Sequence, residues 1–397
     1  MTPSDSDSHR PLRILIGCDT FSPDVNGAAR FAERLAAGLV ERGHEVHVMA
    51  PGRRYRRTPA AVEIVEGQPV MLHRPPSVRW PPHDWLRFVW PWRAKHYARK
   101  VVDAVQPDVI HIQSHFVIGR GLSRVARKRG IPMIATNHVM AENILDFTVM
   151  PPLMDKLVMK GLWADVTHTL GMARAVTTPT RRAADFLEGT SGIRGVIPIS
   201  CGIDRSHYRP DPTPRTEHRL LFVGRLTTEK RVDVTLRAIK RLDPALDVKF
   251  DIVGGGDQLK HLEQLTEGLG LQDRVTFLGR IDDAELVETY RRASVFVISS
   301  IAELQSIATL EAMASGLPII AADAVALPHL VQNGENGYLF EPDNDQQLAA
   351  RITDVLTASP EEWQRMQQAS LDGAAVHDIT RTLDTFEALY RDEPLPE

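Results

Sequence analysis

The chain has 397 residues, of which 43% are hydrophobic and 25% are charged, which suits a globular protein with more than one core. Its formal net charge of −4 excludes a global basic field, so we expect no nucleic-acid partner. The only cysteines, Cys18 and Cys201, exclude a disulfide framework and a cysteine-based metal site. The sequence has neither an apolar run long enough to span a bilayer nor the apolar core of a signal peptide near residue 1, so a reducing cytoplasm fits.

Strand and helix patterns alternate along the chain in two series, which predicts an α/β protein with two parallel sheets and helices on both faces. The predicted strands of the first series cover 13–17, 45–50, 109–112, 132–136 and 175–178, with an amphipathic helix over 28–42. Those of the second series cover 219–223, 249–253, 274–278, 294–300 and 318–321. We expect a disordered tail over 1–11, domains over 12–195 and 205–375 joined by a crossing over 196–204, and a C-terminal helical segment over 376–397.

Two carboxylates flank a predicted helix start in the second series. Glu303 precedes the helix and Glu311 lies inside it, with Ser306 as the expected N-cap and a Gly-Leu-Pro stop at 316–318. A helix start offers unpaired N–H groups and a positive dipole end, so a diphosphate is well placed there. One carboxylate would then be available for sugar hydroxyls and the other for a ribose. The alternative is that both are solvated surface charges.

Phosphate-binding residue types follow the strand over 219–223. Arg225 and Lys230 lie in the sequence Gly-Arg-Leu-Thr-Thr-Glu-Lys at 224–230. A departing diphosphate gathers negative charge, and a guanidinium and an ammonium suit its neutralisation. Gly27, at the start of the first helix, lets backbone N–H groups approach a phosphate. The alternatives are a solvated loop pair and an ordinary turn glycine.

These residues resemble the retaining nucleotide-sugar glycosyltransferases of family four. The resemblance is most specific over 303–318, which matches the family's signature of two Glu with seven residues between them and its Glu-Ala-Met-Ala-x-Gly-x-Pro tail. Residues 21–28 resemble the family's first glycine loop, although many members have two glycines where Asn26 and Gly27 stand; Asn also tolerates left-handed backbone angles. Residues 135–138 resemble the segment with the family's active-site histidine, here His138.

The resemblance spans nearly the whole chain and implies the GT-B fold of two facing Rossmann-like domains. By this likeness the domain over 12–195 binds the acceptor, the domain over 205–375 binds the donor, and the segment over 376–397 returns to the first. It also implies retention by front-face attack, in which the leaving phosphate oxygen helps to take the acceptor proton. No nucleophilic carboxylate is expected with confidence at the reacting centre, so we infer no double displacement.

The resemblance assigns roles to individual residues. The predicted catalytic residues are His138, Arg225, Lys230 and Glu303, with Glu303 orienting the donor sugar and His138 bonding a sugar hydroxyl or a carbonyl. The predicted donor-binding residues are Asn26, Gly27, Gly224, Gly254, Gly256, Arg280, Leu304, Gln305, Ser306 and Glu311, the last on the ribose hydroxyls. The alternative for His138 is a satisfied core histidine, and His111 and His115 are weaker candidates. No metal is expected, because Asp343-Asn344-Asp345 fits a helix cap better than a metal site.

An aromatic and basic segment over 79–100 gives the best indication of the acceptor. It holds four of the six Trp and six basic residues, and Trp favours membrane interfaces while Lys and Arg favour anionic headgroups. The predicted membrane or acceptor residues are Trp80, Trp85, Arg87, Trp90, Trp92, Arg93 and Lys95. The alternative is a Trp-rich core turn beside a solvated helix face. A second apolar segment over 145–163 could line a lipid entrance or belong to the core.

Taken together, the sequence predicts a cytoplasmic hexosyltransferase, peripheral on the inner face of the plasma membrane. Its donor would be UDP-glucose or GDP-mannose, its acceptor a diacylglycerol- or phosphatidylinositol-type lipid, and it would need no cofactor. Three alternatives stay open: the same transfer to an inositol phosphate, a sugar or a glucan; a sugar-nucleotide-binding protein without catalysis; and a sugar-nucleotide epimerase. The sequence does not identify the nucleotide base, the hexose or the oligomeric state.

Overall fold

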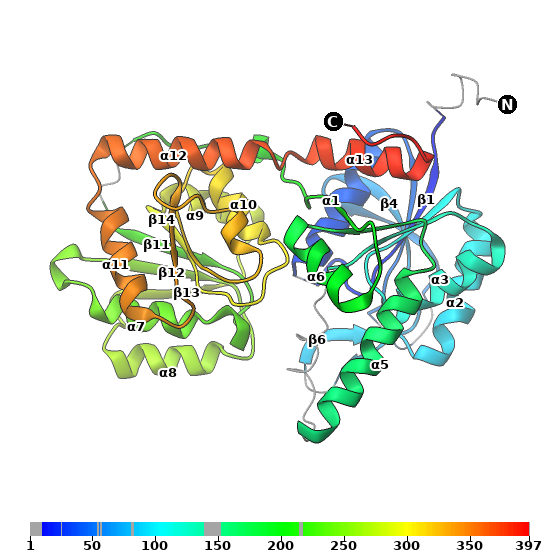
Figure 1. Ribbon diagram of the computed structural model, residues 1–397, viewed down its shortest axis with the longest axis horizontal. Helices are drawn as coiled ribbons and strands as arrows, with labels where there is room; N and C mark the ends of the chain where they lie inside the picture. The colour runs from blue at the N-terminus through cyan, green and yellow to red at the C-terminus, as the bar shows by residue number, and fades with distance from the viewer. Residues whose placement is uncertain are drawn as a thin grey trace. The chain divides into compact units, whose positions relative to one another are not determined.

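The computed structural model describes residues 10–24, 26–53, 55, 58–80, 83–138, 152–213 and 217–396, with only the backbone described at residue 80, at 83–86 and at 152–159. Contacts divide the chain into two compact units (Figure 1). The first unit runs to Ser200 and takes up the chain again from Arg381, and the second runs from Cys201 to Thr380. The first division point falls within the predicted crossing over 196–204. Residues 1–9 of the predicted tail lie outside the described residues.

The first unit is built on an eight-stranded sheet whose order is β10-β9-β8-β7-β1-β2-β4-β3. All neighbours are parallel except β3 and β4, which are antiparallel. Its strands are β1 (Arg13–Gly17), β2 (Glu45–Met49), β3 (Ala61–Val65), β4 (Gln68–His73), β7 (Val109–Ile112), β8 (Met133–Thr136), β9 (Ala175–Thr178) and β10 (Ile197–Pro198). The central strands are buried on both faces, as continuous apolar runs predict for parallel sheets.

Six helices and a hairpin accompany this sheet in the described part of the first unit. The helices are α1 (Gly27–Glu41), α2 (Pro91–Val105), α3 (Val117–Arg129), α5 (Pro152–Leu170), α6 (Arg181–Ser191) and α13 (Ile379–Arg391), the last belonging to this unit from Arg381. The hairpin joins β5 (Val78–Trp80) to β6 (His83–Phe88) in antiparallel pairing. Neither the hairpin nor the pair β3–β4 was among the predicted strands. Residues 145–151 of the predicted apolar segment over 145–163 lie outside the described residues.

The second unit is built on a six-stranded parallel sheet of order β13-β12-β11-β14-β15-β16. Its strands are β11 (Arg219–Val223), β12 (Lys249–Val253), β13 (Val275–Gly279), β14 (Val295–Ile298), β15 (Ile319–Ala322) and β16 (Gly337–Phe340). Its helices are α7 (Val232–Arg241), α8 (Leu259–Leu269), α9 (Asp283–Arg292), α10 (Ile307–Ala314), α11 (Asp345–Leu356) and α12 (Pro360–Ala375). Helix α7 packs with α8 and α11, and α10 packs with α12; Figure 1 shows the two groups on opposite sides of the sheet. Both predicted parallel sheets are therefore confirmed.

Each sheet has one place where the strand order reverses. In the first unit it lies between β1 and β7, and in the second between β11 and β14. Loops that follow the two strands at such a point diverge to opposite faces and leave a crevice at the carboxyl edge, where ligands of open α/β sheets bind. The strand order thus selects the loops after β1 and β7, and after β11 and β14, as the candidate site of each unit.

Candidate active site

In the second unit, backbone hydrogen bonds tie together the loops at the carboxyl edge. The Ile301 N–H, after β14, donates to the Glu229 carbonyl, after β11, at 3.0 Å. The Ala326 N–H, after β15, donates to the Glu303 carbonyl at 3.2 Å. These bonds hold the strand-reversal loops in a fixed relation, so their side chains are positioned by the sheet.

Lys230 and Glu303 form an ion pair at this strand reversal. The Lys230 Nζ donates to Glu303 Oε1, and the two side chains are only 15% and 11% exposed. Lys230 ends a short 3-10 turn over Thr228–Lys230, and Glu303 lies in the loop before α10. The structure therefore brings together two residues that the sequence placed 73 positions apart.

Glu311 lies inside α10 and is 6% exposed. The fully buried Tyr290 of α9 donates its hydroxyl toward Glu311 Oε2 at 3.1 Å and toward the Ala308 carbonyl at 3.2 Å. Ser306 caps α10, because its Oγ accepts a hydrogen bond from the Thr309 N–H at 3.3 Å. The predicted helix start and the placement of Glu303 before it and Glu311 within it are confirmed.

Glycines after β11 and β12 let two loop backbones touch. Gly254 has φ +129°, and a Cβ there would lie 1.8 Å from the Gly224 carbonyl oxygen. A Cβ on Gly256 would lie 2.2 Å from the Leu226 carbonyl oxygen. Side chains are excluded at both positions, so only glycine fits these two close backbone contacts.

The remaining predicted donor residues take varied positions in the second unit. Arg225 lies on the loop after β11, 3.9 Å from Glu229 across their charged groups. Arg280 is exposed directly after β13. The side chain of Gln305 accepts a hydrogen bond from the Cys201 N–H at 2.7 Å, and Leu304 is its partly buried neighbour. Their roles toward a donor stay predictions.

In the first unit, the loop after β1 leads directly into α1. Asn26 caps this helix, since its Oδ1 accepts from the Ala29 N–H at 2.9 Å, and Gly27 is the first helical residue. Asn26 has φ −155°, so its backbone is extended and the left-handed conformation considered for it is wrong. An Asn suits the position because its side chain satisfies a free helical N–H. Arg74 steadies the same loop by donating to the Ser22 carbonyl at 2.8 Å.

His138 lies two residues beyond the end of β8. Its Nε2 is 2.9 Å from Gln113 Oε1, after β7, and its ring packs against Phe31 of α1 with 4.9 Å between centroids. Burial lowers the pKa of His138 to about 3, so the imidazole is neutral near pH 7 and suits hydrogen bonding rather than charge compensation. Within the described part of the chain, a hydrogen-bond partner accounts for only one ring nitrogen of His138, so the role of a satisfied core histidine is half met.

The loop after β7 is held by a partly buried carboxylate that the sequence analysis did not single out. Asp19, after β1, accepts from the Ile118 N–H at 2.9 Å and from Ser114 Oγ at 2.5 Å, and burial raises its pKa. Nearby, His115 is 2% exposed, neither of its ring nitrogens has a hydrogen-bond partner among the described residues, and burial lowers its pKa to about 4. His111 is fully buried within β7, so it has a structural place, and burial lowers its pKa to about 3.

The aromatic segment splits between the β5–β6 hairpin and the start of α2. Trp90 and Trp92 stack with 4.7 Å between ring centroids, and Trp92 is 72% exposed. Arg87 donates to the Gly52 carbonyl at 3.0 Å and to Ser77 Oγ at 2.9 Å, which gives it a structural task within the unit. The side chains of Trp80 and Trp85 lie outside the described residues, so their predicted membrane contact stays a prediction.

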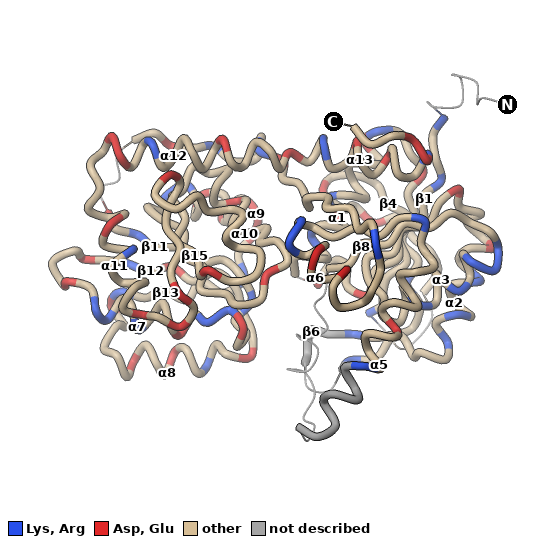
Figure 2. Tube along the Cα trace, in the orientation of Figure 1, with Lys and Arg blue, Asp and Glu red and all other residues tan. Residues whose placement is uncertain are grey.

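The α2–α3 face, defined here as the exposed residues of these two helices, is strongly basic. Lys and Arg number nine in the two helices, at 93, 95, 99, 100, 120, 124, 127, 128 and 129, against the single acidic residue Asp103. Figure 2 shows the resulting blue segments over α2 and α3. Arg120 pairs with Asp165 and Arg129 with Asp103, whereas Arg93 and Lys95 of the predicted membrane set are exposed and pair with no described acid. The predicted grouping of exposed Trp with basic residues thus extends to α3.

Two features of the described residues concern a metal cofactor and a membrane-spanning helix. No group of three or more His, Cys, Asp or Glu side chains in that part of the chain is arranged to hold a metal ion. None of the helices in the same part combines the length and the apolar composition needed to cross a bilayer.

Several residues of the site escaped the sequence analysis. Tyr290, Asp19, Gln113 and Arg74 contact predicted site residues or their loops, and each partner is distant in the sequence. A detectable signal existed for Asp19 and Gln113, because each follows a buried strand within two residues. Tyr290 and Arg74 lie in ordinary amphipathic or loop patterns.

Two Rossmann-like sheets, each with loops gathered at a strand reversal, define the class of GT-B glycosyltransferases. Residues 25–207 match the family described as Glycosyltransferase Family 4, and residues 204–371 match Glycosyl transferases group 1. A GDP-mannose-dependent alpha-mannosyltransferase of Mycolicibacterium smegmatis is 30% identical over 358 residues, which cover 87% of this chain and 89% of that protein. The chain belongs to family 4 of the retaining nucleotide-sugar glycosyltransferases, whose reaction needs no metal cofactor.

Two other relatives also align with most of this chain. An alpha-monoglucosyldiacylglycerol synthase of Streptococcus pneumoniae is 28% identical over 371 residues, covering 88% of this chain and 79% of that protein. A D-inositol 3-phosphate glycosyltransferase of Catenulispora acidiphila is 26% identical over 390 residues, covering 93% and 91%. Among solved structures, a sucrose-phosphate synthase of Thermosynechococcus elongatus superposes with a TM-score of 0.76 at 20% identity, covering 96% of this chain and 99% of that one, which supports the fold.

Proposed function

We propose that the enzyme moves a glucose or mannose from UDP-glucose or GDP-mannose to a hydroxyl of a membrane lipid of the diacylglycerol or phosphatidylinositol type. The observation that carries the donor half is the Lys230–Glu303 pair at the strand reversal between β11 and β14. A cation and a carboxylate joined there match the two parts of a sugar nucleotide, which are an anionic diphosphate and a hydroxyl-rich sugar.

The pair has hydrogen-bonding capacity left for both parts of the donor. An ammonium has three N–H donors, and only one is used by Glu303. Glu303 accepts this bond through Oε1, so Oε2 can accept from a sugar hydroxyl. Lys230 would therefore contact phosphate while Glu303 orients the hexose, with Arg225 as a second cation for the diphosphate.

Glu311 is proposed to hold the ribose. Its carboxylate is buried and bonded by Tyr290, so its position is fixed from behind by α9. Two ribose hydroxyls are donors that a carboxylate accepts well. A neutral His138 would bond a hydroxyl of the transferred sugar, and retention would follow from front-face attack with the leaving phosphate oxygen as the proton acceptor.

The acceptor half rests on two kinds of support. The streptococcal relative is named for making a glucosyldiacylglycerol, and the α2–α3 face here has the charge that an anionic bilayer attracts. Each Lys or Arg near an anionic surface contributes about 1 kcal/mol. We therefore propose peripheral binding of this face to the inner surface of the plasma membrane.

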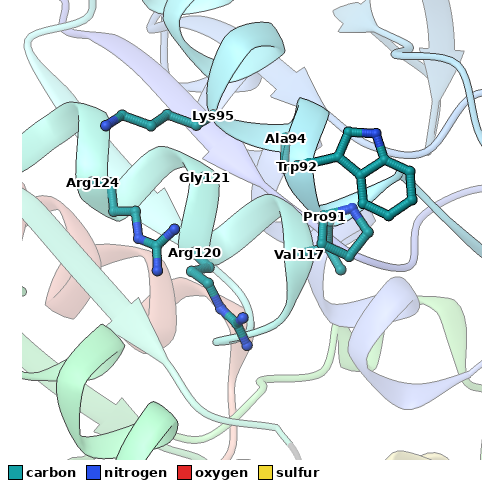
Figure 3. A pocket seen from close by; sticks show the side chains of 8 residues that line it. All are labelled: Pro91, Trp92, Ala94, Lys95, Val117, Arg120, Gly121 and Arg124. Atoms are coloured by element: carbon teal, nitrogen blue, oxygen red, sulfur yellow. The ribbon is translucent and has the colours of Figure 1, made fainter.

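A small hollow lies between α2 and α3 and combines apolar and basic side chains. Trp92, Lys95, Arg120 and Arg124 line it, as Figure 3 shows. The two helices approach closely there because Gly121 lacks a side chain: a Cβ would lie 3.0 Å from the Ala94 carbonyl carbon. An interfacial Trp beside Lys and Arg suits the boundary between acyl chains and headgroups.

The test of the membrane half is sedimentation with vesicles of phosphatidylcholine alone or mixed with phosphatidylglycerol. We expect binding to the anionic vesicles that weakens with salt, and loss of it in Lys95→Glu/Arg124→Glu and in Trp92→Ala. The matched control is Lys240→Glu, an exposed lysine of α7 in the second unit. Equal loss in the control, or equal binding to neutral vesicles, contradicts the assignment of this face.

The test of the transfer is incubation of labelled UDP-glucose or GDP-mannose with vesicles containing diacylglycerol or phosphatidylinositol. We expect label in the lipid extract, abolished by Glu303→Gln. The soluble alternative is favoured by the inositol-phosphate relative, so inositol 3-phosphate is run in parallel. Transfer to it without vesicles, and none to lipid, would replace the lipid acceptor while leaving the donor assignment intact.

A further inference from the structure

Four polar side chains of the first unit form one continuous hydrogen-bonded chain that ends at His138. His138 Nε2 lies 2.9 Å from Gln113 Oε1, and Gln113 Nε2 lies 3.2 Å from His111 Nε2. His111 Nδ1 lies 2.7 Å from Oη of Tyr390, on the C-terminal helix α13. Since Gln113, His111 and Tyr390 are 3%, 0% and 5% exposed, water does not compete for these bonds.

The amide of Gln113 fixes the direction of the protons. Its Oε1 only accepts, so the nitrogen that faces it, His138 Nε2, must carry the proton. Its Nε2 only donates, so His111 Nε2 must be a bare acceptor, which also suits the Thr136 hydroxyl 2.7 Å away. Both imidazoles are neutral, because burial lowers the pKa of each to about 3. His111 therefore holds its proton on Nδ1 and donates it to Tyr390.

We propose that Tyr390 is a positioning residue that sets the tautomer of His138 through His111 and Gln113. In this direction the Tyr390 oxygen is the acceptor for the His111 Nδ1–H. With that oxygen in place, His138 is protonated on Nε2 and presents a bare Nδ1, which can accept a hydrogen bond from a sugar hydroxyl. This inference rests on the proposed role of His138 in transfer.

Loss of the oxygen reverses the chain. A Phe at 390 leaves the His111 Nδ1–H without an acceptor, beside the Phe386 ring whose centroid is 4.9 Å from that of His111. The His111 proton then moves to Nε2, which faces the Gln113 amide nitrogen. Two donors would oppose each other, so the amide turns over and places its NH2 against His138. The His138 proton moves to Nδ1, and the acceptor for the sugar hydroxyl is lost.

The decisive measurement is long-range 1H–15N NMR of the full chain with 15N-labelled histidine, which distinguishes the two neutral tautomers. We expect His138 as the Nε2–H form and His111 as the Nδ1–H form in the wild type, assigned with His138→Ala and His111→Ala. In Tyr390→Phe we expect both to change tautomer. Wild-type tautomers retained in Tyr390→Phe, or the opposite tautomers in the wild type, overturn the proposal.

Gln113→Glu gives a second test that does not need the tyrosine variant to fold. A carboxylate accepts at both ends, so we expect His138 to stay Nε2–H while His111 changes to Nε2–H and accepts from the Tyr390 hydroxyl. Both histidines unchanged, or both reversed, contradict the chain.

Transfer kinetics separate positioning from stability. We expect Tyr390→Phe to lower kcat about tenfold or more, in line with the loss of the His138 hydrogen bond to the sugar hydroxyl, with the donor KM nearly unchanged. Thr382→Val is the matched control, since it removes another buried hydroxyl of α13, bonded to the Ser200 carbonyl at 3.0 Å, outside the chain to His138. An equal fall of kcat in the control overturns the positioning role. A tautomer change in a protein that transfers no sugar at all leaves the chain standing and rejects the proposed function.

Discussion

Replacement of Lys230 by Met tests the donor assignment most directly. The change shortens the side chain by one heavy atom and removes the charge. If the ammonium bonds the diphosphate, its loss removes one charge-assisted hydrogen bond, worth about 1.5–3 kcal/mol. At about 1.4 kcal/mol for each factor of ten, the loss of this bond alone should raise the dissociation constant for the nucleoside diphosphate roughly 10- to 150-fold, and the newly unpaired Glu303 adds to the rise.

The location of Lys230 justifies the upper part of this range. The side chain is only 15% exposed, so solvent screens its interaction with phosphate less than that of a surface lysine. The assay is isothermal titration calorimetry with UDP and with GDP, which also identifies the preferred base. Lys240→Met, an exposed lysine of α7 in the same unit, is the matched control. Unchanged UDP and GDP affinity in Lys230→Met would show that the diphosphate binds elsewhere.

Three further outcomes follow from single contacts. Gly254→Ala should abolish stable folding of the second unit, because a Cβ there meets a carbonyl oxygen at 1.8 Å, whereas Gly255→Ala, with nothing within 4 Å, should melt like the wild type in a thermal scan. Burial raises the pKa of Glu33 from 4.5 to about 7. The folded state therefore holds the proton more tightly, so the free energy of unfolding should fall as pH rises from about 4.5 to about 7, by at most about 3 kcal/mol, and Glu33→Gln should flatten this slope in urea titrations. Tyr290→Phe removes the hydroxyl that bonds Glu311 at 3.1 Å, and it should raise the donor KM several-fold with little change in the KM for the acceptor. An unchanged donor KM would contradict the proposed binding of the ribose by Glu311.

Most of the strands found from sequence are buried on both faces. Val295–Ile298 is an uninterrupted apolar run and is fully buried, so composition alone defines it. The pair β3–β4 was missed because β3 lies at the sheet edge with Val62 and Ile64 exposed, which gives no buried period to detect. The short β16 begins at Gly337, whose backbone approaches Ile319 so closely that a Cβ would clash at 1.8 Å. A glycine in the sequence is typical of a loop, so β16 was not predicted.

The parts of the site found from sequence were those that follow strands. Lys230 and Glu303 could be expected at the same edge of the sheet, because parallel strands bring their carboxyl ends to one edge. Tyr290 and Tyr390 could not be placed from the sequence, since their partners are set by how α9 and α13 pack. The Tyr390–His111 contact joins residues 279 positions apart, and no local pattern of spacing reports it. Gln305 is the opposite case. It lies in the most specific motif of the sequence, yet its side chain accepts a hydrogen bond from the Cys201 backbone.

The proposed position of the Glu303 carboxylate beside a diphosphate requires an electrostatic explanation. An unpaired Glu303 would repel the diphosphate, and like charges at about 4 Å cost about 4 kcal/mol at an effective dielectric constant of 20. Its ion pair with Lys230 removes most of that repulsion. The carboxylate can then lie next to phosphate and still accept from the sugar, which a neutral amide would do more weakly.

This explanation makes a prediction for the double variant. In Lys230→Met the binding loss has two parts, the missing cation and the newly unpaired Glu303. Lys230→Met/Glu303→Gln removes the second part, so it should bind UDP or GDP more tightly than Lys230→Met alone while transferring no sugar. Titration calorimetry of the wild type, both single variants and the double variant gives the coupling directly. Strictly additive effects on diphosphate affinity would mean that Glu303 does not act on the phosphate through Lys230, and the bridging role of the pair would have to be abandoned.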